Sequence, residues 1–182
     1  MKKRIAAFLA AAALALLGCL GGCDKLREQM TDYDQLVRDT LAREYSFTAD
    51  IAYNGTDATV YVVKTGVGDL QVDFLAPAAM EGLSVTAVGD ALTARFRGME
   101  VDISAYALPA QSVLVLLREV LSGEKEKLVT RADEDSVTAS GSILLTSFDL
   151  IFDKDTMKLR QVLIPSVEGV ADITEFDFLD ES

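Results

Sequence analysis

Histidine is absent from this sequence of 182 residues, and no cysteine lies beyond Cys23. Without histidine, the chain lacks the commonest general base and the commonest metal ligand in proteins. It also lacks a Gly-x-Ser-x-Gly sequence, a glycine-rich phosphate loop and paired-cysteine metal motifs. Carboxylate pairs such as Glu100 with Asp102 are expected by chance among 29 acidic residues. We therefore expect a protein that is not an enzyme and that has no cofactor and no metal site.

Basic residues are also scarce. Residues 1–22 contain three of the 17 basic residues and none of the 29 acidic ones, so 14 basic residues remain and the net charge of residues 23–182 is −15. Such a surface repels phosphate groups, because a nucleic-acid-binding protein needs a basic patch. We expect no nucleic-acid partner. Half of the residues are hydrophobic, and the chain is long enough for one domain with a core that no disulfide stabilises.

A long hydrophobic run is missing as well. The uncharged apolar run Ile5–Leu17 has 13 residues, whereas a helix needs about 20 to cross a bilayer. The run follows the basic start Lys2–Arg4 and ends in small residues, which is the pattern of an export signal. We therefore predict that residues 1–22 are a signal peptide.

Two cysteines lie at the end of this signal. Leu16–Cys19 and Leu20–Cys23 both resemble the lipobox of bacterial lipoproteins, in which a small residue precedes a cysteine that becomes diacylated and then the mature N-terminus. The resemblance implies lipidation at Cys19 or Cys23; the alternatives are two buried thiols or a disulfide between them. Cys19 directly follows the apolar segment, whereas Cys23 follows two glycines, so both stay candidates. Lipidation would place the protein at the cell membrane, lipid-anchored on its extracytoplasmic face.

Residues 23–32 are predicted to be a tether and residues 33–182 the folded domain. Apolar residues recur at spacings of three and four along residues 24–44, which indicates a helix that Thr31 or Asp32 could cap. After Tyr45 the period changes to two, and Asn54-Gly55 favours a hairpin turn. The predicted strands are Ser46–Tyr53, Ala58–Thr65, Leu70–Phe74, Leu83–Val88, Leu92–Arg97, Met99–Ile103, Leu128–Arg131, Ser136–Ser140, Ile143–Phe152, Lys158–Ile164 and one within Val167–Phe178.

One helix interrupts the strands. Pro109 suits its start and Gly123 the position after its end. The apolar stripe between them consists of Val113, Leu116, Leu117, Val120 and Leu121, and Leu114 and Val115 widen it. A helix with so broad an apolar surface must be covered on both sides. The sequence therefore predicts an α+β fold, with a single curled antiparallel sheet and this helix inside it or across its mouth.

The segment Asp153–Met157 lies between two predicted strands and has alternating aspartates. A calcium loop that began at Asp153 would need glycine at its sixth position and glutamate at its twelfth, which are Lys158 and Ile164 here. An ordinary hairpin turn is therefore the preferred interpretation.

This order of elements resembles a known superfamily. The signal with its lipobox, the leading helix, the strand that includes Phe47–Ile51, the mid-chain apolar helix and the segment Phe148–Leu159 are similar to the bacterial lipoprotein carriers and their LolA-, LolB- and LppX-like relatives. The resemblance covers residues 33–178. It implies an unclosed β-barrel whose concave apolar face, lidded by the N-terminal and mid-chain helices, holds acyl chains.

We therefore predict a membrane-anchored lipoprotein that binds a lipid or an acyl chain. The candidate lining residues are Phe74, Leu83, Val85, Phe96, Val101, Leu114 and Leu117, each of which could equally be ordinary core. The alternative is an interaction or envelope-sensor module, in which the sheet is filled by its own side chains and an envelope protein docks on the acidic outer face.

Overall fold

The computed structural model describes residues 32–104, 113–122, 128–143 and 146–181. The chain divides into two units, Met1–Asp32 and Tyr33–Ser182, and the fold given below is that of the second unit. The predicted signal peptide, both cysteines and residues 23–31 of the predicted tether lie outside the described residues. No membrane-spanning helix is found in the described part of the chain.

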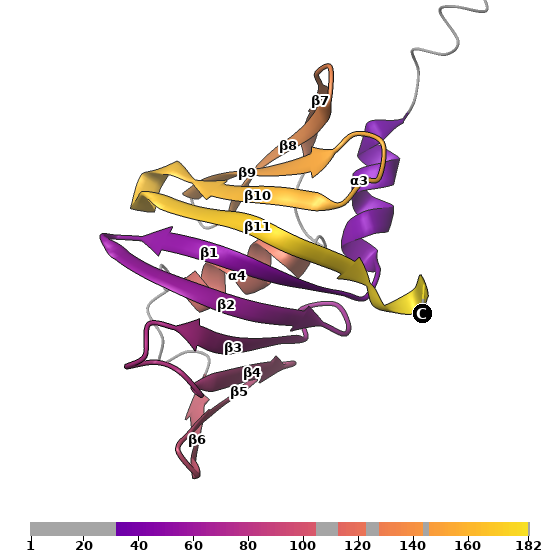
Figure 1. Ribbon diagram of the computed structural model, residues 1–182. Helices are drawn as coiled ribbons and strands as arrows, with labels where there is room; N and C mark the ends of the chain where they lie inside the picture. The colour runs from indigo at the N-terminus through magenta and orange to yellow at the C-terminus, as the bar shows by residue number, and fades with distance from the viewer. Residues whose placement is uncertain (1–31, 105–112, 123–127, 144–145, 182) are drawn as a thin grey trace, which may run out of the picture. The chain divides into compact units, whose positions relative to one another are not determined.

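Eleven strands in the described residues form one sheet in the order β6-β5-β4-β3-β2-β1-β11-β10-β9-β8-β7. Every neighbouring pair is antiparallel, and the sheet curls without closing, since β6 and β7 stay at opposite edges (Figure 1). The strands are β1 (Tyr45–Tyr53), β2 (Thr56–Lys64), β3 (Leu70–Ala76), β4 (Ser84–Val88), β5 (Ala91–Phe96), β6 (Met99–Ser104), β7 (Val129–Ala132), β8 (Ser136–Ile143), β9 (Thr146–Asp153), β10 (Leu159–Ile164) and β11 (Gly169–Phe178). The predicted α+β class with an unclosed curled sheet is confirmed.

The strands form two meanders that meet at the centre of the sheet. β1 to β6 run in sequence order to one edge, and β7 to β11 return from the other edge until β11 pairs with β1. The turn between β1 and β2 is the predicted one: Asn54 and Gly55 have φ of 48° and 76°. Positive φ at both central residues gives a turn whose twist matches that of the flanking strands.

Side chains alternate between the two faces of the sheet. On β1, Phe47, Ala49 and Ile51 are buried on the inner face, which we define as the face that α4 (Val113–Ser122) packs against. The residues between them, such as Asp50, lie on the opposite, outer face. The period of two in the sequence thus predicted both the strands and the side that forms the core.

The two described α-helices lie at the inner face. In α4, Leu116, Leu117, Val120 and Leu121 are at most 3% exposed, whereas Leu114 and Val115 are half-buried. This is the predicted stripe, although Pro109 and Gly123 lie outside the described residues. α3 (Tyr33–Ala42) buries Val37, Thr40 and Leu41 and contacts β7, β8 and α4.

Polar contacts fix α4 to one end of the sheet. Arg118 donates hydrogen bonds to the carbonyl of Gly68, at 2.9 Å, and to the carbonyl of Gly89. These glycines belong to the β2–β3 and β4–β5 connections, and the Gly89 N–H donates to the carboxylate of Asp69 at 3.1 Å. The Arg118 guanidinium therefore links α4 to both the β2–β3 and the β4–β5 connections.

The prediction of one long strand over Ile143–Phe152 was wrong. Ile143 ends β8 and pairs with Thr146, the first residue of β9, so a hairpin divides the predicted strand. The sequence hid this turn because its two connecting residues, 144 and 145, are both leucine rather than glycine, asparagine or aspartate. Both residues lie outside the described ranges.

The start and the end of the domain are joined. The Arg43 guanidinium forms an ion pair with Asp180 at 2.6 Å and lies 3.6 Å from the centre of the Phe178 ring. The Leu179 N–H donates to the carbonyl of Glu44 at 3.0 Å. These contacts extend the central β1–β11 pairing beyond the last residue of β11.

Candidate functional site

The inner face beneath α4 is the place where the carrier resemblance predicts a ligand. There, Leu117 of α4 packs over Ile51 of β1 and Val162 of β10, together with residues of β11. The cavity that these residues line has a volume of about 10 Å³. A single water molecule needs roughly 10–15 Å³ of such volume, so this cavity has no room for an acyl chain.

The seven predicted lining residues fall into three groups. Phe74, Val85 and Leu117 are core residues with exposures of 8%, 7% and 2%. Leu83 and Leu114 are half-buried and pack against that core, and Phe96 is half-buried. Val101 is 58% exposed.

The strand register brings some of these residues together. Val85 and Val101 both pair with Ala94, from opposite sides, and the Phe74 N–H donates to the carbonyl of Leu83 at 2.8 Å. Of the other three, Phe96 ends β5 and pairs with Met99 of β6, whereas Leu114 and Leu117 lie on α4. Ligand binding by the seven residues stays a prediction.

Burial decreases steadily toward the β6 edge of the inner face. Along one row of paired residues, Val62 and Val72 are at most 1% exposed, Val85 is 7% exposed and Val101 is 58% exposed. Met99, two residues before Val101 on β6, is 64% exposed. We call Phe96, Met99 and Val101 the apolar margin. Phe96 and Val101 were predicted from the sequence as lining residues, whereas Met99 was not, although the alternation of Met99, Val101 and Ile103 places it on the same face.

A buried polar pair lies at the other end of β1 and β2. Tyr45 and Lys64 are paired residues, each 1% exposed. The Lys64 ammonium donates to the carbonyl of Arg43 at 3.0 Å and lies 5.3 Å from the centre of the Tyr45 ring, within the range of a cation–π contact. The Tyr45 hydroxyl has no hydrogen-bond partner among the described residues. Alternation along β2 places Lys64 on the same face as Val60 and Val62, but sequence reasoning missed the pair because lysine is rarely buried.

Burial shifts both groups toward their neutral forms. It lowers the pKa of Lys64, against the opposing effect of the Glu44 and Asp69 carboxylates, and it raises the pKa of the Tyr45 hydroxyl. The pair thus makes opposite contributions to the pH dependence of stability. Between the lowered pKa of native Lys64 and the ordinary pKa of an unfolded lysine, the unfolded state holds more protons, so the free energy of unfolding increases with pH. Above the ordinary pKa of an unfolded tyrosine, the native state still holds the Tyr45 proton, so the free energy of unfolding decreases with pH.

We expect Tyr45→Phe to raise the free energy of unfolding by about 1–3 kcal/mol, because a buried hydroxyl without a partner is lost. An unfolded tyrosine ionises near pH 10, so the wild type loses further stability above that pH and the variant does not. Urea unfolding between pH 7 and 11 measures both effects, with the more exposed Tyr61→Phe as the matched control. A constant difference between Tyr45→Phe and wild type across this range would contradict the burial of an un-ionised hydroxyl.

The outer face has an open acidic groove beside the β1–β2 hairpin. The groove has a volume of about 370 Å³, and its walls include Asp50, Asp57 and Asp172. Two of these carboxylates have neutral partners: Thr59 donates to Asp50 at 2.8 Å and Gln161 donates to Asp172 at 2.5 Å. No group of three potential metal-ligating side chains occurs among the described residues. The groove can attract cations, but it has no coordination shell for one.

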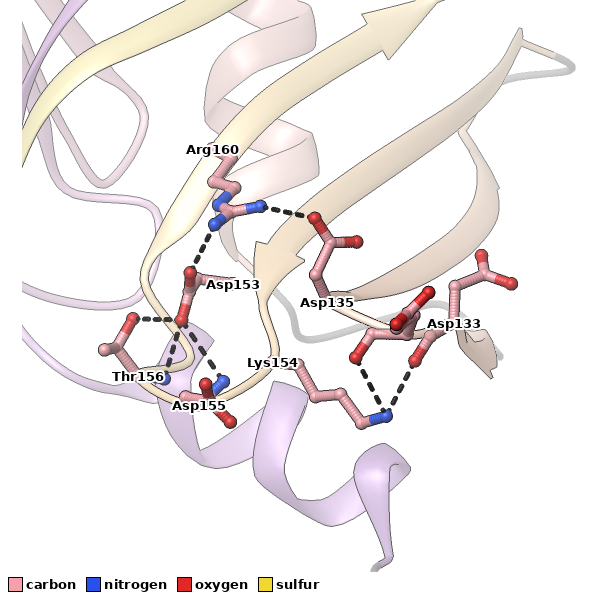
Figure 2. Close-up of polar contacts among 8 residues, drawn as sticks. Asp133, Asp135, Asp153, Lys154, Asp155, Thr156 and Arg160 are labelled. Carbon is pink, nitrogen blue, oxygen red and sulfur yellow. Dashed lines mark hydrogen bonds and ion pairs between the residues drawn. The ribbon is translucent and has the colours of Figure 1, made fainter.

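The Asp153–Met157 segment is a hairpin turn, as preferred from the sequence (Figure 2). The Asp153 carboxylate accepts hydrogen bonds from the Thr156 N–H and hydroxyl at 2.9 and 2.8 Å, and Arg160 contacts it at 2.6 Å. The two Thr156 hydrogen bonds, more than Arg160, hold the pKa of Asp153 below its ordinary value. Arg160 also reaches Asp135 at 3.6 Å. The Asp153 carboxylate therefore stabilises its own turn, and Arg160 links that turn to Asp135 in the β7–β8 turn.

No family model matches the chain, and no curated protein matches it in sequence. Among solved structures, the crystal structure of an uncharacterized conserved protein from Thermus thermophilus is similar, with a TM-score of 0.56, 11% identity and coverage of 81% of this chain and 88% of that chain. A LolA superfamily protein from Nitrosomonas europaea has a TM-score of 0.44, 11% identity and coverage of 81% and 95%. The resemblance is one of fold. The structural neighbours thus include a member of the superfamily that the sequence resembles, and the likeness concerns the fold alone.

A structure of the MucA/MucB complex from Pseudomonas aeruginosa is also similar, with a TM-score of 0.46 and 12% identity. The match covers 80% of this chain and 56% of that chain.

Proposed function

We propose that this protein is a non-enzymatic binding module, lipid-anchored on the extracytoplasmic face of the cell membrane, that docks a protein partner. The observation that supports docking over acyl-chain storage is the close packing of the described residues beneath α4, where Leu117 and its strand neighbours leave a cavity of about 10 Å³. Pockets that enclose small ligands have volumes of roughly 300–1,000 Å³. An acyl chain beneath Leu117 would have to displace α4 from the sheet.

Such a displacement is costly. Leu116, Leu117 and Leu121 of α4 are at most 2% exposed, and exposure of a buried leucine costs about 1.5–3 kcal/mol. Arg118 would also lose its two carbonyl partners in the connections beneath the helix. These contacts support a closed inner face and a binding surface located elsewhere.

The proposed binding surface is the apolar margin. Phe96, Met99 and Val101 extend the inner face to the edge of the sheet, and no described element covers Met99 and Val101, which are 64% and 58% exposed. Exposed apolar residues that are contiguous with a core typically mark interaction surfaces. This exposure also favours a second candidate function, in which an acyl chain enters the inner face from the β6 edge.

Photo-crosslinking separates the two functions. A photoreactive amino acid replaces Val101 in the full-length protein in intact cells, and the matched control replaces Val129, which is 70% exposed on the opposite edge strand. We expect a protein adduct of one defined mass from position 101 and none from position 129. A lipid adduct at position 101 would support acyl-chain binding instead. No adduct, or equal adducts at both positions, would contradict both functions.

A further inference from the structure

We propose that β6 binds its partner by strand addition. An extended segment of another protein pairs with the free edge of β6, places apolar side chains against the apolar margin and presents a basic side chain to Asp102. The inference rests on the proposed function and adds the mode of binding and the chemistry of the partner. Strand addition is a recurrent form of peptide recognition, in which main-chain hydrogen bonds supply affinity and alternate side chains supply specificity.

The backbone of β6 is suited to pairing. Within the described residues β6 pairs only with β5, through a two-residue turn in which Arg97 and Gly98 have φ of 50° and 82°. In such a hairpin the residues beside the turn form a hydrogen-bonded pair, and hydrogen-bonded pairs then alternate along the strands. By this alternation, the N–H and C=O groups of Glu100 and Asp102 point away from β5, toward the free edge.

The two edges of the sheet differ in their inner faces. At the β7 edge, α3 contacts the strand, and the Thr130 hydroxyl donates a hydrogen bond to Asp34 of that helix. At the β6 edge, Met99 and Val101 stay exposed. A strand added to β6 would lie about 4.8 Å beyond it, so that the inward side chains of the added strand would cover these two residues.

Charge indicates what kind of strand fits. On the outer side of β6, Glu100 already pairs with Arg95 at 2.7 Å, whereas Asp102 accepts a hydrogen bond from the neutral Thr93 at 3.0 Å. An antiparallel second copy of β6 would set Glu100 and Asp102 against acidic residues, and like charges opposite each other destabilise a strand pair. The edge therefore disfavours self-pairing and favours a foreign strand with alternating apolar and basic residues.

The test uses the full-length lipidated protein in nanodiscs of phosphatidylcholine, which carries no net charge, and a fluorescent ten-residue peptide of alternating valine and lysine. Fluorescence anisotropy measures its affinity. We expect Asp102→Pro, which removes an edge N–H, and Val101→Asp, which places a charge in the margin, each to weaken binding at least tenfold. The matched control Val129→Asp, on the opposite edge, leaves binding within twofold of wild type.

Two peptide controls keep the test independent of variant folding. A peptide with the same composition but with the valines and lysines in separate blocks, and an alternating peptide with N-methylated backbone amides on one edge, should each bind at least tenfold more weakly. Equal binding of either control, or no binding of the alternating peptide, overturns strand addition. If position 101 still crosslinks a protein in cells, the proposed function survives that result; if it does not, the proposed function fails whatever the peptide does.

Discussion

Replacement of both Cys19 and Cys23 by alanine is expected to abolish membrane retention or to block maturation of the protein. Two acyl chains anchor a protein stably, because each buried methylene contributes about 0.8 kcal/mol. Little else would hold this chain at a bilayer, since residues 23–182 carry a net charge of −15 and anionic headgroups repel a negative surface. Fractionation of cells into membrane and soluble proteins, followed by mass spectrometry of the mature N-terminus, measures the effect.

The single variants determine which cysteine is modified. Only the variant at the acylated position should lose its anchor, and the other variant serves as the matched control for the loss of a thiol. A double variant that is normally processed and fully retained in the membrane would contradict the lipid anchor.

We expect Gly141→Ala to lower the free energy of unfolding by about 1–3 kcal/mol, the usual cost of overpacking a core. Gly141 on β8 lies directly opposite Phe148 on β9. A Cβ atom at position 141 would lie 2.6 Å from Cζ of the Phe148 ring and 3.1 Å from Cδ2 of Leu128. Phe148 is 3% exposed, so the ring cannot move outward without displacing other core residues. Urea unfolding at neutral pH measures the loss.

A double variant tests whether the ring is the cause. Phe148→Leu removes the outer ring atoms, so Gly141→Ala should cost less in that background, with a coupling of about 0.5–3 kcal/mol. Ser142→Ala, at an exposed neighbouring position on β8, is the matched control and should change little. Additive losses from Gly141→Ala and Phe148→Leu would rule out the contact as the source of the effect.

Local patterns in the sequence were sufficient to predict most of the fold. The alternation along residues 46–53, the Asn54-Gly55 turn and the apolar stripe of α4 each reflect a local rule of backbone geometry. The division between β8 and β9 was not predictable in the same way, because the two leucines between Ile143 and Thr146 continue an apolar run. The register of the two strands, with Gly141 facing the Phe148 ring, depends on contacts across the sheet that periodicity does not encode.

The candidate site was harder to predict than the fold. The sequence identified Phe74 and Val101 as equivalent apolar residues of an inner face, yet they are 8% and 58% exposed. The difference follows the strand order, since Phe74 lies on the interior strand β3 and Val101 on the edge strand β6, and no local pattern fixes that order. The burial of Lys64 likewise depends on its partners, the Arg43 carbonyl and the Tyr45 ring, which lie outside β2.

The pairing of β1 with β11 at the centre of the sheet bears on how the domain reaches its native state. A ribosome releases the N-terminal meander first, and β1 then has β2 on one side and nothing on the other until the last ten-residue strand is complete. Contacts between the two ends of a chain give a high contact order, which slows folding. The domain therefore stays incompletely folded until β11 has been synthesised, which would suit the proposed export of the chain across a membrane before it folds.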